Sequence, residues 1–207
     1  MPVPSHESTV PRQSGLHRRC VRTVVVVVAL SAAVTFAGGK HPFEYLDDQT
    51  GATISVVGEP LVFAHDRASA PGPGDYVTLV AAAVDQSGEL GYVLIKYCWS
   101  VGALRASVAE QCATAPLLLE ADDRNIELLL RKGSARDAGI GVAVHHPPFG
   151  TATPYVYSID LPTMQFISEC HHLSLRVGSG DTPFSYELFE DRLASLREFV
   201  RHVSANN

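Results

Sequence analysis

Residues Tyr76–Trp99 read YVTLVAAAVDQSGELGYVLIKYCW and contain two long apolar runs on either side of a short polar segment. The polar segment, 85–89, has the composition of a hairpin turn, so the runs 76–84 and 90–99 are predicted to be paired antiparallel strands. Apolar side chains occupy both alternating faces of the second run, which is typical of a central strand. Lys96 is the exception, and it predicts that the strand approaches a sheet edge there or that the amine reaches water.

More strands are predicted on both sides of this hairpin. Apolar and β-branched residues bounded by Gly, Pro, Asp or Ser turns indicate strands at 52–57, 61–65, 117–120, 125–130, 140–144, 155–159 and 173–177. The segments 117–120 and 125–130 flank a polar turn and are predicted to form a second hairpin. A helix over 123–132 is the alternative for that stretch.

Two helices are predicted in the C-terminal half. Asp160-Leu161-Pro162 resembles a helix start, and apolar residues follow it at helical spacing. The second helix is predicted to begin at Thr182-Pro183, and its apolar residues recur at steps of four and three, namely Phe189, Leu193, Leu196, Val200 and Val203. The sequence therefore predicts an α+β fold, mainly an antiparallel β-sheet with a short helix and a long C-terminal amphipathic helix packed on it.

An export signal is predicted near the N-terminus. Arg18, Arg19 and Arg22 form a basic cluster before the unbroken apolar run 23–36, which is the layout of a secretory signal peptide. The run is shorter than the roughly 20 residues that span a bilayer, so we expect cleavage after Ala37. Arg18 and Arg19 also resemble a twin-arginine signal, although Arg22 interrupts the apolar residues expected after the pair.

Cleavage at this point divides the chain into a signal peptide, 1–37, and a single mature domain, 38–207, which is periplasmic or secreted. In the alternative, residues 23–39 anchor an uncleaved chain in the membrane, and membrane contact is expected only in that case. The mature part holds 12 basic and 21 acidic residues, a formal net charge of −9. Nucleic acid is excluded as a partner because phosphate binding needs clustered lysine and arginine. The candidate partner is another envelope protein.

Three cysteines remain in the mature domain: Cys98, Cys112 and Cys170. An odd number in an oxidising compartment allows one disulfide and one leftover thiol. We prefer the pair Cys98 and Cys112, because a bridge there closes a loop of about 15 residues and contributes about 3 kcal/mol. The alternative is three buried, inert thiols.

Motifs of common enzymes are missing from the sequence. Neither a Gly-x-Ser-x-Gly elbow nor a Gly-Lys-Ser/Thr phosphate loop occurs, and no cofactor is expected. Asp47-Asp48 and Asp122-Asp123 are adjacent carboxylates whose side chains diverge from the backbone, so neither pair alone forms a glycosidase-like dyad. We interpret both pairs as solvated turns, and we favour a protein that is not an enzyme.

The histidines are the remaining candidates for chemistry. His145 and His146 precede a double proline, and His171 and His172 follow Cys170 at the predicted end of a helix. Imidazole and thiolate are suitable ligands for zinc or copper. The spacings that organise known metal sites are absent, however, so surface or turn histidines are the preferred interpretation. An exported metal-binding protein or metal-dependent enzyme that uses the two histidine pairs is the alternative.

Three segments carry a resemblance to known proteins. Residues Tyr45–Ala64, YLDDQTGATISVVGEPLVFA, the hairpin Tyr76–Trp99 and the segment Phe184–Val200 resemble a family of uncharacterised exported bacterial proteins, many of them lipoprotein-like. This chain lacks the cysteine that would follow the apolar run of a lipoprotein. The resemblance implies localisation in the cell envelope and no activity. Taken together, the sequence predicts an exported cell-envelope protein with a non-enzymatic binding or assembly role.

Overall fold

The computed structural model describes residues 41–65, 74–101, 112–113, 116–149, 152–177 and 184–205. Residues 37–207 form one compact unit. The predicted signal peptide and the predicted helix start Thr182-Pro183 lie outside the described residues. Among the described helices, none is both long and apolar enough to cross a membrane.

The hairpin predicted from the sequence is the central element of the sheet. Strands β4 (Asp75–Gln86) and β5 (Glu89–Ser100) pair antiparallel along their whole length, from Asp75 opposite Ser100 to Gln86 opposite Glu89. The turn residues Ser87 and Gly88 both have positive φ, 58° and 85°, as expected for a two-residue turn that matches the twist of its strands. Strand β5 pairs with β8 (Tyr155–Ile159) along its other edge, so it is a central strand as predicted.

The second edge of β4 is shared by two strands. Strand β2 (Ala52–Val56) pairs with the half of β4 near the turn, and β3 (Leu61–His65) pairs with the other half. Residues 57–60 connect them, and the Val57 amide still donates to the Ala81 carbonyl at 3.0 Å. This connection holds more residues than the stretch of β4 opposite it, so it protrudes from the sheet.

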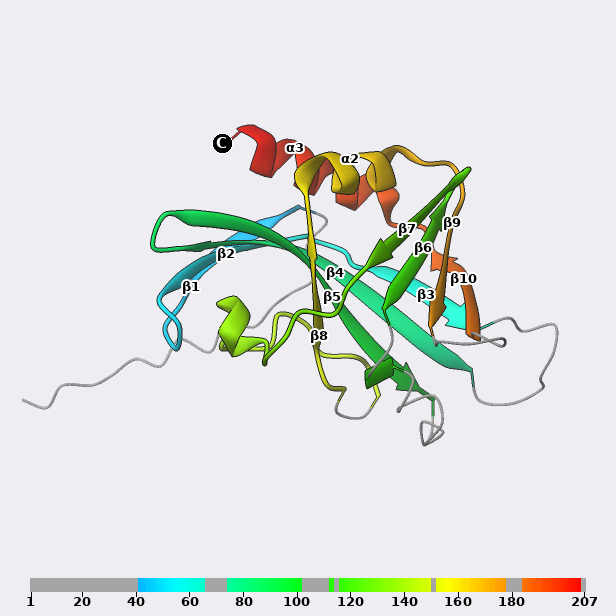
Figure 1. Ribbon diagram of the computed structural model, residues 1–207, viewed down its shortest axis with the longest axis horizontal. Coiled ribbons are helices and arrows are strands. Elements are labelled where there is room, and N and C mark those ends of the chain that lie inside the picture. Colours follow the sequence, from blue (N-terminus) through cyan, green and yellow to red (C-terminus); the bar gives the residue numbers. More distant parts are fainter. Residues whose placement is uncertain are drawn as a thin grey trace, which may run out of the picture. The chain divides into compact units, whose positions relative to one another are not determined.

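The described strands form one antiparallel sheet that curls until its ends meet. Beyond β3 the order is β10 (Phe184–Glu190), β9 (Leu173–Val177), β6 (Leu117–Ala121) and β7 (Arg124–Leu128). An isolated bridge between Leu130 and Tyr157, and the hydrogen bond from the Arg131 amide to the Val156 carbonyl, join the end of β7 to β8. The strands β8-β5-β4-β3-β10-β9-β6-β7 therefore make a closed ring (Figure 1). Strand β1 (Phe43–Asp47) pairs with β2 outside this ring.

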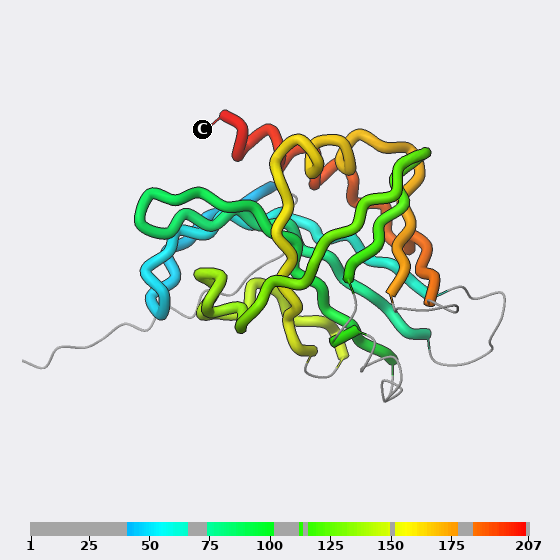
Figure 2. The backbone as a smooth tube through the Cα atoms, in the orientation of Figure 1, coloured from blue at the N-terminus to red at the C-terminus, as the bar shows by residue number. Residues whose placement is uncertain are grey.

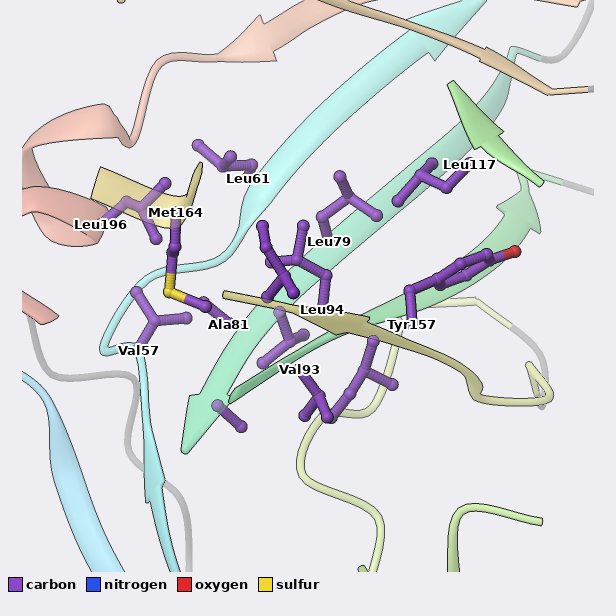
Figure 3. Packing of buried hydrophobic residues seen from close by; sticks show 14 of the residues in the cluster. Val57, Leu61, Leu79, Ala81, Val93, Leu94, Leu117, Tyr157, Met164 and Leu196 are labelled. Carbon is purple, nitrogen blue, oxygen red and sulfur yellow. The ribbon is translucent and has the colours of Figure 1, made fainter. Parts of the chain in front are cut away.

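The core fills the interior of the ring. Residues that lie opposite each other on paired strands point to the same face of the sheet. The face that points into the ring is buried, and Leu79, Leu117 and Leu175 are examples from three strands. The alternate residues Glu120 and Arg176 are partly exposed and form an ion pair at 3.8 Å. Figure 3 shows labelled members of the core: Leu61, Leu79, Leu94, Leu117 and Tyr157.

Helices α2 and α3, one short and one C-terminal, accompany the sheet. Helix α2 (Leu161–Glu169) follows β8, and its first turn is capped by Asp160, whose carboxylate accepts from the Thr163 amide at 2.7 Å. Helix α3 (Leu193–Ala205) contacts α2 and strand β4. The tube in Figure 2 shows both helices at the same end of the sheet. The fold is thus α+β with a mainly antiparallel sheet, as predicted.

Three expectations about strands, helices and Lys96 are wrong, and one strand was missed. Residues 184–190 form strand β10, because Phe184, Tyr186 and Leu188 alternate and pair with β3 and β9. The segment 140–144, predicted as a strand, is a loop, and a short 3-10 helix, η1 (Arg136–Ala138), precedes it. Strand β1 was not predicted. Lys96 neither lies near a sheet edge nor reaches water, because it is 0% exposed in central strand β5. The hairpin β6–β7, by contrast, is confirmed over the helical alternative.

Candidate functional site

A groove of about 320 Å³ lies on the outer face of β3 and β4, at the end of β5. We call it the Trp99 groove. Its lining comes from strands β3, β4, β5 and β10, from the β2–β3 connection, from the residue before α3 and from the loop before β8. The lining residues are Gly58, Glu59, Pro60, Val62, Thr78, Trp99, His145, Pro148, Phe189, Glu190 and Arg192. Apolar and charged side chains are therefore combined in one surface depression, as in many ligand sites.

Trp99 is the only tryptophan of the chain, and its position in the groove is fixed. The indole Nε1 donates to Thr78 Oγ1 at 2.9 Å in a buried hydrogen bond. Tyr76 stacks on the indole with ring centroids 4.4 Å apart and planes 14° apart. These contacts hold the side chain in one orientation, so the groove has a preformed aromatic wall.

Two partly exposed phenylalanines extend this aromatic surface. Phe149 is 49% exposed and stacks on Trp99 at a centroid distance of 6.1 Å. Phe189 is 47% exposed and meets Tyr76 edge to face at 5.6 Å. Phe149, Trp99, Tyr76 and Phe189 therefore form a continuous row of aromatic side chains, and two of them are half-exposed. Such a contiguous apolar surface indicates a binding site, whereas single exposed apolar residues do not.

A bulge in β10 explains why Phe189 lies here. Leu188 pairs with Phe63 and Glu190 with Val62, so Phe189 is an additional residue in the pairing with β3. A bulge of this kind disrupts normal alternation and redirects side chains. As a result Phe189 and Glu190 both line the groove.

One end of the groove is charged. Arg192 reaches the Glu190 carboxylate at 3.2 Å through Nη2 and the Glu59 carboxylate at 3.6 Å through Nη1. Glu59 and Arg192 are 27% and 39% exposed at their side chains, and Glu190 is 46% exposed. The guanidinium thus lies between two carboxylates that water reaches, and one negative charge is left uncompensated.

The backbone around these charges is held by helix α3. The amide of Glu59 donates to Ser195 Oγ at 2.9 Å, which ties the β2–β3 connection to the first turn of the helix. The Asp191 carboxylate accepts from the Leu193 amide at 3.1 Å and caps the helix start. Arg192 therefore emerges from a fixed helix N-terminus, and Glu59 faces it from a protruding but anchored turn.

His145 is the one predicted candidate residue that lines the Trp99 groove. Burial, with a smaller contribution from His146, lowers the pKa of its imidazole, so the ring is neutral at pH 7. The ring also contacts Tyr97 edge to face at 5.6 Å. His145 is therefore a packed, uncharged wall residue.

The two histidine pairs do not come together. His171 and His172 follow α2, and both of their amides donate to the Asp122 carboxylate in the β6–β7 turn, at 3.0 and 2.8 Å. In Figure 1 the α2–β9 connection and the loop before β8 lie at opposite ends of the sheet. Within the described ranges no group of three or more His, Cys, Asp or Glu side chains is arranged to hold a metal ion.

The carboxylate pairs have different environments. Asp122 lies in the exposed β6–β7 turn with a positive φ of 49° and connects that turn to the α2–β9 junction.

Asp47, in contrast to the prediction, is buried at 1% exposure. It accepts from the backbone amides of Gln49 and Thr50, and at 2.7 and 2.9 Å from those of Gly141 and Val142. These hydrogen bonds hold its pKa below the ordinary value against the effect of burial, and they fasten the loop after η1 to the β1–β2 turn.

The cysteines follow the preferred pairing of the sequence. Cys98 on β5 forms a disulfide with Cys112, and both are buried. Cys170 is free, and its thiol donates to the Ile167 carbonyl at 3.1 Å. Burial raises the pKa of this thiol to about 11, so it is protonated and unreactive at neutral pH.

The opposite face of β5 holds a second unusual side chain. Lys96 lies inside the ring with its Nζ 5.0 Å from the ring centroid of Tyr157 and 5.5 Å from that of Tyr155. Within the part of the chain that the structure describes, Nζ has no hydrogen-bond partner. Burial lowers its pKa from 10.5 to about 8. The two tyrosine faces offset part of the cost of burying the charge.

Sequence reasoning did not anticipate the Trp99 groove. Trp99 was predicted in a strand with its face buried, and Phe189, Glu190 and Arg192 were predicted in a helix. The groove depends on a bulge in β10 and on the protruding β2–β3 connection, and neither feature has a sequence motif that would predict it. Comparison of the chain with protein-family models, with curated proteins and with solved structures found no match.

Proposed function

We propose that this chain is an exported cell-envelope protein that binds a partner protein without catalysing a reaction, and that the Trp99 groove is its binding surface. The observation that carries the proposal is the half-exposed aromatic surface of Phe149 and Phe189 around a fixed tryptophan. Aromatic side chains contribute a large contact area at a small entropic cost, and they are enriched among residues that dominate binding energy.

Export is supported by the sequence of the first 37 residues, with periplasmic or secreted localisation as the main proposal and an anchored form as the alternative. A non-enzymatic role is favoured because the groove combines apolar and paired charged residues with a neutral, packed His145. We also infer that the apolar side of α3 covers the sheet, since Leu196, Phe199 and Val203 are buried. That packing would hold the charged end of the groove in place.

Site-specific photo-crosslinking in the producing cell tests this function. A photoreactive phenylalanine analogue replaces Phe189 in the groove, or Leu129, the residue just after β7, which is 72% exposed and is the control. We expect a discrete crosslinked product from position 189 and none from position 129. The mature N-terminus of the recovered protein, read by mass spectrometry, tests cleavage after Ala37 in the same sample.

The proposal is contradicted if position 189 gives no product, or if both positions give the same products. Thr78→Ser, which keeps a hydroxyl next to the indole, should preserve the crosslink. A substitution that introduces charge, Val62→Asp, should remove it, because Val62 lines the groove. Circular dichroism of each variant shows that the loss is local.

A further inference from the structure

We propose that the Trp99 groove recognises a cationic segment of its partner, in which a lysine or arginine side chain lies next to an apolar residue. This inference rests on the proposed function, because it names the chemistry of the partner that the same groove binds. It concerns the charged end of the groove, where Glu59, Glu190 and Arg192 meet.

The charge balance at this end favours a cation. Two carboxylates contact one guanidinium, so the cluster has a net charge of −1. The other titratable lining residue, His145, is neutral because burial lowers its pKa. Asp191 caps the start of α3 next to the cluster and adds a further negative charge. An incoming anion would be repelled by this excess of negative charge. An incoming cation would instead bind the two carboxylates together with Arg192.

The aromatic lining suits the same kind of group. Phe189 and Glu190 are adjacent in sequence and both face the groove because of the bulge in β10. A guanidinium or ammonium group can lie on the face of an aromatic ring while it pairs with a carboxylate. The apolar stretch formed by Pro60, Val62 and Pro148 offers a surface for the methylene groups of the same side chain and for an apolar neighbour.

Charge over the whole domain acts in the same direction. Residues 38–207 contain 12 basic and 21 acidic residues. A field of this sign raises the local concentration of cationic segments and accelerates their association, more strongly at low salt. Both the local cluster and the overall charge therefore select the same sign of partner.

Fluorescence of the single tryptophan provides a direct assay. The full processed protein is titrated with three capped peptides, Gly-Leu-Xaa-Pro-Gly, in which Xaa is Arg, Gln or Glu. Because Trp99 lines the groove, its emission should change on binding. We expect the Arg peptide to bind about 2- to 5-fold more tightly than the Gln peptide, and the Glu peptide to bind most weakly. The preference for Arg should shrink as the salt concentration rises.

Charge-neutralising variants locate the effect. Glu59→Gln and Glu190→Gln should each weaken binding of the Arg peptide about 2- to 5-fold and leave the Gln peptide almost unaffected. Glu127→Gln is the matched control, because Glu127 is an exposed residue of β7 on another part of the sheet. It changes the net charge by the same amount and should leave both affinities unchanged.

The inference is overturned if the Glu peptide binds as tightly as the Arg peptide, if no Arg peptide alters Trp99 emission at millimolar concentration, or if Glu127→Gln weakens binding as much as Glu190→Gln. A crosslink from position 189 together with any of these results retains the proposed function and removes the cationic partner. Loss of the crosslink itself removes the proposed function.

Discussion

Lys96 and Trp99 are three residues apart on β5, on opposite faces of the same strand, and their surroundings differ in kind. Lys96 places a cation inside the ring of strands against two tyrosine rings, and within the described residues its Nζ has no hydrogen-bond partner. Trp99 faces a groove whose cation, Arg192, has two carboxylate partners and contact with water. The charge of Lys96 on the inner face is therefore unpaired among the described residues and lowers the stability of the fold. On the outer face the charges are paired, and a charged ligand can replace one partner of a pair.

This comparison predicts that changes on the inner face alter the free energy of unfolding, and that changes on the outer face mainly alter binding. Cys98, Lys96 and Thr78 allow the two faces to be separated. Cys98 and Lys96 belong to the inner face of the hairpin, and Thr78 belongs to the outer face.

The largest effect is expected from removing the disulfide on the inner face. Cys98→Ala combined with Cys112→Ala should lower the free energy of unfolding by about 3 kcal/mol, since the bridge restricts the unfolded chain. Urea denaturation of the oxidised protein and the double variant measures the difference. Cys170→Ala is the control for loss of a buried thiol without a bridge. A loss below about 1 kcal/mol would contradict a main contribution of the bridge through restriction of the unfolded chain.

The second effect is a dependence of stability on pH that comes from Lys96. Its pKa is about 8 in the folded protein and 10.5 when exposed, so between these values the unfolded chain binds more protons than the folded one. Stability should therefore rise by up to about 2 kcal/mol between pH 7.5 and pH 9.5. Above pH 10 the trend should reverse, because burial raises the pKa of Tyr97 and Tyr157 and delays their ionisation in the folded state.

Lys96→Met identifies the source of this dependence. An apolar side chain of similar length should remove the rise with pH and should stabilise the protein at pH 7 by about 2 kcal/mol. Lys132→Met changes an exposed lysine and should do neither. If Lys96→Met destabilises the protein at pH 7, the ammonium has stronger partners than the two tyrosine faces.

The smallest effect on stability is expected on the outer face. Thr78→Val leaves the buried Trp99 Nε1 without its acceptor and should cost about 1 kcal/mol. The tryptophan emission maximum should shift, because the indole can then change its orientation. Thr78→Ser keeps the acceptor and should leave both the unfolding free energy and the emission spectrum close to those of the original protein. Equal losses from Val and Ser would contradict a specific contribution of the hydroxyl group.

The hairpin around β4 and β5 was predictable because alternation, length and turn chemistry all agree over Tyr76–Trp99. The β10 segment was not, because Phe189 and Leu193 fit a helical repeat while Phe184 and Tyr186 fit a strand. Pairing with β3 and β9, which are distant in sequence, decides between the two. The pattern of neighbouring residues in the sequence does not reveal this pairing.

The Trp99 groove was less predictable than the fold. It depends on one extra residue in β10 and on a four-residue connection between β2 and β3, and neither alters composition or periodicity. The environment of Lys96 was also beyond the sequence. A single lysine in a strand usually lies at an edge or reaches water, and its burial here follows from closure of the sheet around it.

Closure at Leu130 and Tyr157 also limits how this protein can associate through backbone hydrogen bonds. A sheet that ends in open strands offers unpaired amides and carbonyls to other chains, which favours aggregation. Within the described residues, β7 and β8 meet at this bridge, and strand β1 pairs on one side only. Strand β1 is five residues long and carries the exposed Glu44, and short, charged edges discourage pairing. Association through side chains, as in the Trp99 groove, is then favoured over the addition of a strand.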